Sequence, residues 1–420
     1  TEDGTQSVTI TITENESAPT VTLATSASSI AENAGSSLTL TATLSVATTA
    51  DVTVGISTSG TGTEGTDYST ISDITISAGA TTGTASFTPS DDSVYEGNET
   101  GIVAISTVSG GSATEDGTQS VTITITENES SPTITLATSA SSIAENAGSS
   151  LTLTATSSIV ADEDITVSIS TSGTGTEGTD YSTISDITIS AGSTTGTASF
   201  TPTDDSVYEG NETGVVAISG VSGADAAESG TQSVTITITE NDSAPTITLA
   251  TSASSIAENA GSSLTLTATS SIVTDEDITV SISTSGTGTE GTDYSTISDI
   301  TISAGQTTGT ATFTPTDDSV YEGNETGVVA IDSVSGADAT ESGTQSVTIT
   351  ITENESAPTV VLTSSTSSIT ENAGSSLTLT ATLSVATTAD VTVGISTSGT
   401  GTEGTDYSTI SDITVSAGQT

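Results

Sequence analysis

The chain repeats one unit, and this repetition limits the folds it can adopt more than any other feature. The segment GTQSVTITITEN begins at residues 4, 117, 230 and 343, so consecutive copies start 113 residues apart without insertion. Solenoid repeats have periods of roughly 20 to 50 residues, whereas a period this long is the size of a small domain. We therefore expect tandem domains of one type. Because the pattern begins and ends within a unit, we also expect the chain to be a segment of a longer polypeptide.

Apolar and polar residues alternate within each unit, as in strands that bury one face. Ile123 and Ile125, for example, are separated by threonine, which suits the solvent face of a strand. In the first complete unit the pattern predicts strands near residues 19–24, 37–46, 51–58, 72–78, 82–88, 100–107 and 118–126. The predicted fold class is all-β, with tandem seven-stranded antiparallel Greek-key (Ig-like) sandwiches. Tyr68, Phe87 and Tyr95, the only aromatic residues of this unit, are expected as core residues and loop anchors in preference to a binding site.

Proline marks the boundaries between units. In ENESAPT and its equivalents, Pro19, Pro132, Pro245 and Pro358 follow the end of a strand-like run. The predicted domains are residues 18–130, 131–243, 244–356 and a truncated 357–420, preceded by residues 1–17 as the last strand of an earlier repeat. Linkers of about two or three residues with a fixed proline angle resist bending, so we expect the domains to be arranged as a rod.

The residue types that the chain lacks exclude several functions. Its 420 residues include 53 Asp and Glu but no Lys, Arg, His, Cys, Met or Trp, which gives a net charge of −53. Nucleic acid and anionic membrane surfaces would repel such a chain. It has no imidazole, thiol or amine side chain for catalysis, so we expect no enzyme; a two-carboxylate glycosidase is the remaining alternative, with little aromatic surface to stack a sugar. Disulfides and Lys-Asn cross-links are impossible, which leaves a bound cation as a source of added stability.

Acidic residues concentrate at loop positions that one end of a sandwich can gather. In the first complete unit they are Glu32, Asp67, Asp91, Asp92, Glu96, Glu127 and Glu129. Two like charges about 4 Å apart repel by roughly 4 kcal/mol at an effective dielectric near 20, so such a cluster needs neutralisation. Many oxygen ligands without nitrogen or sulfur donors favour Ca²⁺ over Mg²⁺. The alternative is a solvated acidic surface that keeps a Ser- and Thr-rich chain soluble.

The order of these elements resembles the Calx-beta domain, which is found in sodium-calcium exchangers, in an integrin subunit and in long bacterial surface proteins. The matching segments are SIAENAGSSLTLTATL, GTEGTDYSTISDITISAGATTGTASFTPSDDSVYEGNE and SVTITITENE. The resemblance implies calcium bound at one end of a seven-stranded sandwich, next to the following domain. This chain has Ser93 where the strongest binders have a third Asp, and Glu127-Asn128-Glu129 where they have an Asp triplet, so fewer or weaker sites are expected.

The resemblance also implies calcium ligands in every unit. In the first complete unit it adds the carbonyl of Val94, and Asn128, to the seven acidic residues above. In the second unit the ligands would be Glu145, Asp180, Asp204, Asp205, Val207, Glu209, Glu240, Asn241 and Asp242. In the third they would be Glu258, Asp293, Asp317, Asp318, Val320, Glu322, Glu353, Asn354 and Glu355. The incomplete units at the two ends would contribute Glu14, Glu16, Glu371 and Asp406.

The sequence therefore predicts a calcium-stiffened structural extender, the stalk or filament shaft of a secreted bacterial surface protein or adhesin. Its partners would be the neighbouring repeats, with other copies in a filament or other surface proteins left open, and its location would be extracellular, at the cell surface. One alternative is an adhesion module that binds carbohydrate, ice or protein through Thr rows or loop tips, and another is a calcium sensor. The units differ only by mild changes such as LSVATTADVTV for SSIVADEDITV, which favours the extender.

Overall fold

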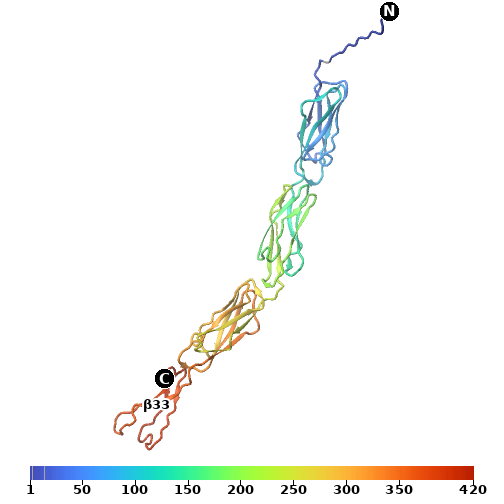
Figure 1. Ribbon diagram of the computed structural model, residues 1–420. Helices are drawn as coiled ribbons and strands as arrows, with labels where there is room; N and C mark the ends of the chain where they lie inside the picture. Colours follow the sequence, from blue (N-terminus) through green and yellow to red (C-terminus); the bar gives the residue numbers. More distant parts are fainter. Residues whose placement is uncertain (2, 14) are drawn as a thin grey trace. The chain divides into compact units, whose positions relative to one another are not determined.

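The computed structural model describes residues 1, 3–13 and 15–420, and every regular element in these ranges is a β-strand. The described chain divides into two compact units, which we treat separately. The first unit comprises Thr1–Ile143, Ala147–Thr203 and Thr213–Ile238, and the second comprises Ala144–Asn146, Asp204–Glu212 and Thr239–Thr420. Each complete repeat is a sandwich of two sheets (Figure 1). A helix long and apolar enough to cross a membrane does not occur in the described ranges.

The first complete repeat contains the seven strands that the alternating pattern predicts and three more. Its strands are β1 (Thr20–Thr25), β2 (Ser29–Ala31), β3 (Leu38–Leu44), β4 (Val52–Gly60), β5 (Ile74–Ile76), β6 (Thr82–Phe87), β7 (Val94–Tyr95), β8 (Glu99–Ser109), β9 (Thr114–Glu115) and β10 (Ser120–Thr126). The pattern does not predict β2, β7 and β9, which have two or three residues each and lie outside the longer alternating runs. The all-β sandwich prediction is confirmed.

The two sheets of this repeat are built from strands that are distant in sequence. One sheet has the order β6-β3-β1-β9 and the other the order β2-β10-β8-β4-β5. Most neighbours are antiparallel, but β9 pairs parallel with β1, and β2 pairs parallel with β10. The β2–β10 pairing joins the beginning of the repeat to its end.

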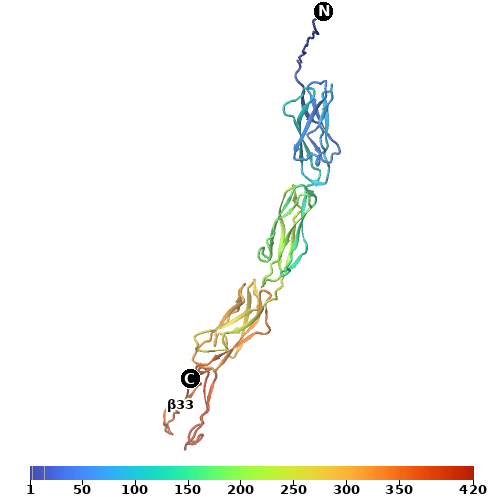
Figure 2. The ribbon, with the colours of Figure 1, turned by 45° about the vertical axis from the view of Figure 1, so that its right-hand side comes forward.

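The inward faces of the strands form one core between the two layers, which are visible in Figure 2. Ile123 and Ile125 on β10 are 0% and 3% exposed. Tyr68 stacks on Phe87 with 4.5 Å between ring centroids, and both rings are buried. Gly101 lies against these rings, because a Cβ atom there would come within 2.7 Å of Phe87. Tyr68 and Phe87 are thus core residues of this repeat, as predicted.

The second and third repeats have the same architecture. The second contains β11 (Thr133–Thr138), β12 (Ser142–Ala144), β13 (Leu151–Ser157), β14 (Val160–Ala161), β15 (Ile165–Gly173), β16 (Ile187–Ile189), β17 (Thr195–Phe200), β18 (Val207–Tyr208), β19 (Glu212–Ser222), β20 (Ala227–Glu228) and β21 (Ser233–Thr239). The third contains β22 (Thr246–Thr251), β23 (Ser255–Ala257), β24 (Leu264–Ser270), β25 (Val273–Thr274), β26 (Ile278–Gly286), β27 (Ile300–Ile302), β28 (Thr308–Phe313), β29 (Val320–Tyr321), β30 (Glu325–Ser335), β31 (Thr340–Glu341) and β32 (Ser346–Thr352). Their sheet orders correspond strand for strand to those of the first repeat.

The two ends of the chain are less regular. The last repeat contains β33 (Val360–Ser364), β34 (Leu379–Leu383), β35 (Ala386–Thr387), β36 (Val391–Val393) and β37 (Ile413–Val415). They form the two-stranded sheets β33-β34 and β36-β37 over a small core. At the other end, residues 3–13 form no strand, and Val8, Ile10 and Ile12 are 87%, 81% and 93% exposed.

Candidate cation site

Strand pairing brings two loops of the first repeat together at one end of the sandwich. Ala31 of β2 lies opposite Thr126 of β10. Glu32 follows β2 directly, and its N–H donates to the carbonyl of Thr126 at 3.1 Å. Glu127 follows β10 directly. The two glutamates, 95 positions apart in sequence, therefore start from adjacent backbone positions.

Glu32, Glu127 and Glu129 form a first carboxylate group, which we call group A. One oxygen from each lies within 4.8 Å of the others. At that separation two full charges repel by about 3.5 kcal/mol at an effective dielectric near 20. Burial raises the pKa of Glu32 to about 7, with Glu127 and Glu129 adding to the effect and the N–H of Asp92 opposing it. The sequence has no Lys, Arg or His to relieve the repulsion.

Glu127 is the anchored member of group A. Its Oε2 accepts hydrogen bonds from the N–H groups of Glu96 at 2.7 Å and Gly97 at 2.9 Å. Its Oε1 accepts from the N–H groups of Asn128 at 2.8 Å and Glu129 at 2.9 Å. Burial raises the pKa of Glu127, but these N–H groups lower it by more, so that it lies below its ordinary value. Glu127 is therefore the member that stays ionised most easily.

Glu129 contributes an acceptor without a donor. Its Oε2 is buried and receives no hydrogen bond, and the same is true of the equivalent atoms, Oδ2 of Asp242 and Oε2 of Glu355. A carboxylate oxygen that is removed from water without a hydrogen-bond donor is unfavourable. A hard divalent cation, which prefers oxygen ligands, would satisfy this atom and offset the repulsion within the group. The residues of group A thus fit such a cation.

Asp67, Glu96 and Glu99 form a second carboxylate group, which we call group B. Their oxygens also lie within 4.8 Å of one another. Asp67 is oriented by the N–H of Thr63, which donates to its Oδ2 at 2.5 Å. Burial, reinforced by the Asp67 charge, raises the pKa of Glu96 to about 8 and that of Glu99 to about 7. Without a cation, this group therefore retains protons near neutral pH.

The other predicted ligands of the first repeat lie beside these groups without joining them. The N–H of Asp92 donates to Glu32 at 3.3 Å, and the Oδ1 of Asp92 accepts from the N–H of Val94 at 2.7 Å. Asp91 and Asn128 are exposed, and neither belongs to group A or group B. A direct role for these four residues as ligands stays a prediction.

The third repeat reproduces both groups. Its group A is Glu258, Glu353 and Glu355, and its group B is Asp293, Glu322 and Glu325. Burial raises the pKa values of Glu258, Glu322 and Glu325 to about 7. Burial also raises the pKa of Glu353, but the N–H groups of Glu355 and Glu322 outweigh it and leave the value at about 2.

The other predicted ligands of the third repeat have the same hydrogen bonds and exposure as those of the first repeat. The N–H of Asp318 donates to Glu258 at 3.3 Å, and the N–H of Val320 donates to Asp318 at 2.6 Å. Asp317 and Asn354 are exposed. The two repeats therefore place corresponding residues in corresponding environments.

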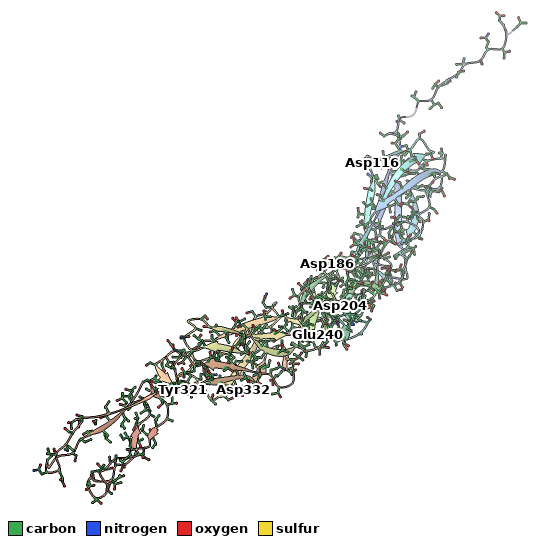
Figure 3. All side chains as sticks on the ribbon, turned by 60° about the horizontal axis from the view of Figure 1, so that its bottom comes forward. Asp116, Asp186, Asp204, Glu240, Tyr321 and Asp332 are labelled. Atoms are coloured by element: carbon green, nitrogen blue, oxygen red, sulfur yellow. The ribbon has the colours of Figure 1, made fainter. Side chains whose placement is uncertain are left out.

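In the second repeat, the predicted ligands are divided between the two compact units. In the first unit, Asp180 accepts from the N–H of Thr176 at 2.6 Å. In the second unit, the N–H of Asp205 donates to Glu145 at 3.2 Å, and burial raises the pKa of Glu145 to about 7. In the same unit, the Glu240 carboxylate accepts hydrogen bonds from four N–H groups, those of Glu209, Gly210, Asn241 and Asp242. The N–H of Val207 donates to Asp205. Asp204, labelled with Glu240 in Figure 3, is exposed, as is Asn241.

The predicted ligands at the two ends of the chain are not gathered in this way. Glu16, Glu371 and Asp406 are exposed, and Glu14 lies outside the described residues. Within the described ranges, no group of three carboxylates includes any of them. Their role as ligands stays a prediction.

Two members of group B, Glu99 in the first repeat and Glu325 in the third, are not among the ligands that the sequence predicts. Glu99 follows Glu96 by three positions in the acidic stretch DDSVYEGNE, which is the signal that points to it. It also begins β8, where an acidic residue is expected on the solvent face of a strand. Only the pairing of β8 with β10 places it at the acidic end.

Comparison with known proteins places residues 14–415 in one family. The Calx-beta domain profile matches residues 14–129, 127–242, 240–355 and 353–415. A search among curated protein sequences found no match. Among solved structures, CBD12 from CALX1.2 is 14% identical, covers 52% of this chain and 99% of its own, and has a TM-score of 0.24. Invasin, described as a bacterial integrin-binding protein, is 16% identical over 81% of this chain and 61% of its own, with a TM-score of 0.26. The adhesin InvE of Yersinia pseudotuberculosis is 13% identical over 54% and 60%, with a TM-score of 0.27. We draw nothing further from these structural likenesses.

Proposed function

The chain belongs to the Calx-beta domain family, and on this basis we propose that it is a calcium-stiffened extender of a secreted bacterial surface protein. In this role each repeat adds length, and bound calcium ions hold the loops at one end of each sandwich. The partners are the neighbouring repeats of the same chain, and the location is the cell exterior. Contact with nucleic acid or a membrane is not part of this role.

The observation that carries the proposal is the pair of carboxylate groups at one end of the sandwich. Glu32, Glu127 and Glu129 would hold one calcium ion, and Asp67, Glu96 and Glu99 would contribute to another. The donors are all oxygen, one of them is a buried atom without a hydrogen bond, and the sequence contains no cationic side chain. When bound, calcium supplies the positive charge that these groups otherwise obtain by retaining protons.

Stiffening follows from where the carboxylates are attached. Group A joins the loop after β2 to the segment that follows β10, and group B joins the loop containing Asp67 to the β7–β8 loop and the first residue of β8. A cation in group A would reinforce the pairing of β2 with β10, and a cation in group B would link the loop containing Asp67 to the start of β8. The same groups in the third repeat support a mechanical role that is repeated along the chain.

Thermal unfolding with calcium, with magnesium and with chelator tests this proposal. At a free calcium concentration about 100 times the dissociation constant, one bound ion adds about 2.7 kcal/mol to the free energy of unfolding, a rise in melting temperature on the order of 10 °C for a repeat of this size. Magnesium should do less, because it needs a compact octahedral site. Small-angle scattering should show a stiffer chain in calcium. Equal melting temperatures and scattering in calcium and chelator would leave only a solvated acidic surface.

A further inference from the structure

One aromatic residue of each of the first two complete repeats is buried in the core of the repeat that follows. Tyr95 lies at the acidic end of the first repeat, yet it packs in the same core cluster as Ala161, Ile165 and Ala224 of the second repeat. Its side chain is 8% exposed. All of these residues belong to the first compact unit. The prediction that Tyr95 is a core residue is therefore confirmed, and the core that it enters is that of the second repeat.

Hydrogen bonds hold Tyr95 at both its backbone and its hydroxyl group. β7 pairs parallel with β14, with Tyr95 opposite Ala161. The N–H of Asp162 donates to the carbonyl of Tyr95 at 3.2 Å. The Tyr95 hydroxyl donates to Oδ2 of Asp225 at 3.0 Å. Burial raises the pKa of Tyr95, and the Asp225 carboxylate raises it further, so the hydroxyl remains a donor.

The loop that presents Asp225 has a strained backbone. Ala224 and Asp225 have φ values of 50° and 49°, in the left-handed region that favours glycine. Their turn is held by the N–H of Ala226, which donates to Gly223 at 2.9 Å, and by the N–H of Ala224, which donates to Glu163 at 3.3 Å. Two consecutive non-glycine residues keep this conformation only where their surroundings impose it, and such strain is typical of a functional contact.

The same contact recurs inside the second compact unit. The Tyr208 hydroxyl donates to Oδ2 of Asp338 at 3.0 Å, and β18 pairs parallel with β25. Tyr208 packs in the core of the third repeat. Ala337 and Asp338 have φ values of 49° and 50°. The contact therefore does not depend on which two repeats are joined.

The chain also contains a natural comparison for the carboxylate of this contact. Tyr321, the equivalent tyrosine of the third repeat, is partly buried and pairs through β29 with β35. In the first repeat, the position equivalent to Asp225 is Ser112, which also has a positive φ of 53°. Serine thus fits the turn but lacks the carboxylate.

We propose that the Tyr95–Asp225 and Tyr208–Asp338 contacts, with their parallel strand pairs, are latches that attach the acidic loop of one repeat to the repeat that follows without a cation. This inference goes beyond the calcium role, because the contacts of the latch involve no carboxylate of group A or group B. The two features still share a loop, since Glu96 and Gly97, which follow Tyr95, donate to Glu127. Asp225 and Asp338 set the specificity of the docking surface, and the partner that it fits is the tyrosine of the preceding repeat.

Spin-label distance measurements on the full chain test the latch. The chain has no cysteine, so Thr43→Cys and Thr156→Cys introduce two labels at exposed, equivalent positions of the first and second repeats. The labelled parent should give a narrow distance distribution in chelator. Asp225→Ser, which installs the residue found at position 112, should lose the narrow distribution in chelator. Tyr95→Phe removes only the hydroxyl and should broaden it less, while Tyr321→Phe is the matched control and should leave it unchanged.

Each outcome either supports the latch or overturns it. A broad distance distribution for the labelled parent in chelator would overturn the latch. Distributions for Asp225→Ser and Tyr95→Phe as narrow as that of the parent would also overturn it. If Asp225→Ser fails to fold by circular dichroism, Tyr95→Phe decides between the two results. The calcium proposal is judged separately: a narrow distribution only in calcium supports that proposal against the latch, whereas narrow distributions in chelator together with no calcium binding would support the latch alone.

Discussion

Residues 5–13 and 118–126 have the same sequence, TQSVTITIT, and different structures. In the second segment, Ile123 is fully buried on β10 between β8 and β2. In the first, Ile10 is 81% exposed and no strand is formed. The alternation of apolar residues and threonine therefore gives the capacity to form a strand, and partner strands are needed to realise it.

The difference extends to the acidic residues that follow the two segments. Glu16 and Glu129 occupy equivalent positions, but Glu16 is exposed whereas Glu129 is partly buried in group A. Group A is therefore created by the pairing of β10 with β2. A short acidic sequence does not make the site by itself.

The largest expected effect comes from the apolar residues of the two segments. Ile123→Ala should lower the free energy of unfolding of its repeat by about 2–5 kcal/mol, because it leaves a cavity in a closed core. Ile10→Ala, the matched change in the first segment, should alter stability by less than about 0.5 kcal/mol. Scanning calorimetry should show a separate transition at lower temperature for Ile123→Ala only. Equal effects of the two changes would mean that residues 5–13 are packed in solution.

A smaller effect is expected from pH in the presence of chelator. The pKa values of Glu32, Glu96 and Glu99 are about 7, 8 and 7, compared with an ordinary value of 4.5. Between about pH 4.5 and 8 the folded chain therefore binds more protons than the unfolded chain, so its stability should fall as pH rises through this window. Calcium should weaken or reverse this trend, because it favours the ionised carboxylates. A melting temperature in chelator that rises from pH 5 to pH 8 would contradict the proximity of these groups.

The smallest expected effect is that of one carboxylate. Glu129→Gln should weaken calcium binding to its repeat about tenfold, because affinity depends on ligand charge, and this corresponds to about 1.4 kcal/mol of lost stabilisation at saturating calcium. In chelator the same change should be neutral or slightly stabilising, since it removes a charge from group A. Glu16→Gln is the control and should do neither. The melting temperatures of the parent chain and the two variants, measured with and without calcium, give the difference in stabilisation by calcium. A loss of stability in chelator for Glu129→Gln would mean that Glu129 has a role in folding alone.

The sequence predicts the features of this molecule that depend on local pattern. The long strands β3 and β10 follow from alternation, and Glu32, Asp67, Glu96, Glu127 and Glu129 follow from the clustering of acidic loops. The strands β2, β7 and β9 are not predicted in this way, because each depends on pairing with a strand that is distant in sequence. Glu99 has the sequence position of an ordinary strand residue, and only the pairing of β8 with β10 places it in group B.

The sequence does not predict which core buries the Tyr95 side chain. Its hydroxyl partner, Asp225, lies 130 positions away, and no periodic pattern within one repeat connects the two residues. Asp225 itself appears in the sequence as one more loop carboxylate. Only the positive φ angles and the shared core show that the two positions act together.

Calcium titration calorimetry of the full chain would show whether the carboxylate groups bind calcium. We expect saturable binding with at least one ion for each complete repeat, reduced by Glu129→Gln and unaffected by Glu16→Gln. If millimolar calcium produced no binding heat and left the melting temperature unchanged, the carboxylate groups would not be cation sites, and the account of this chain as a calcium-stiffened extender would be wrong.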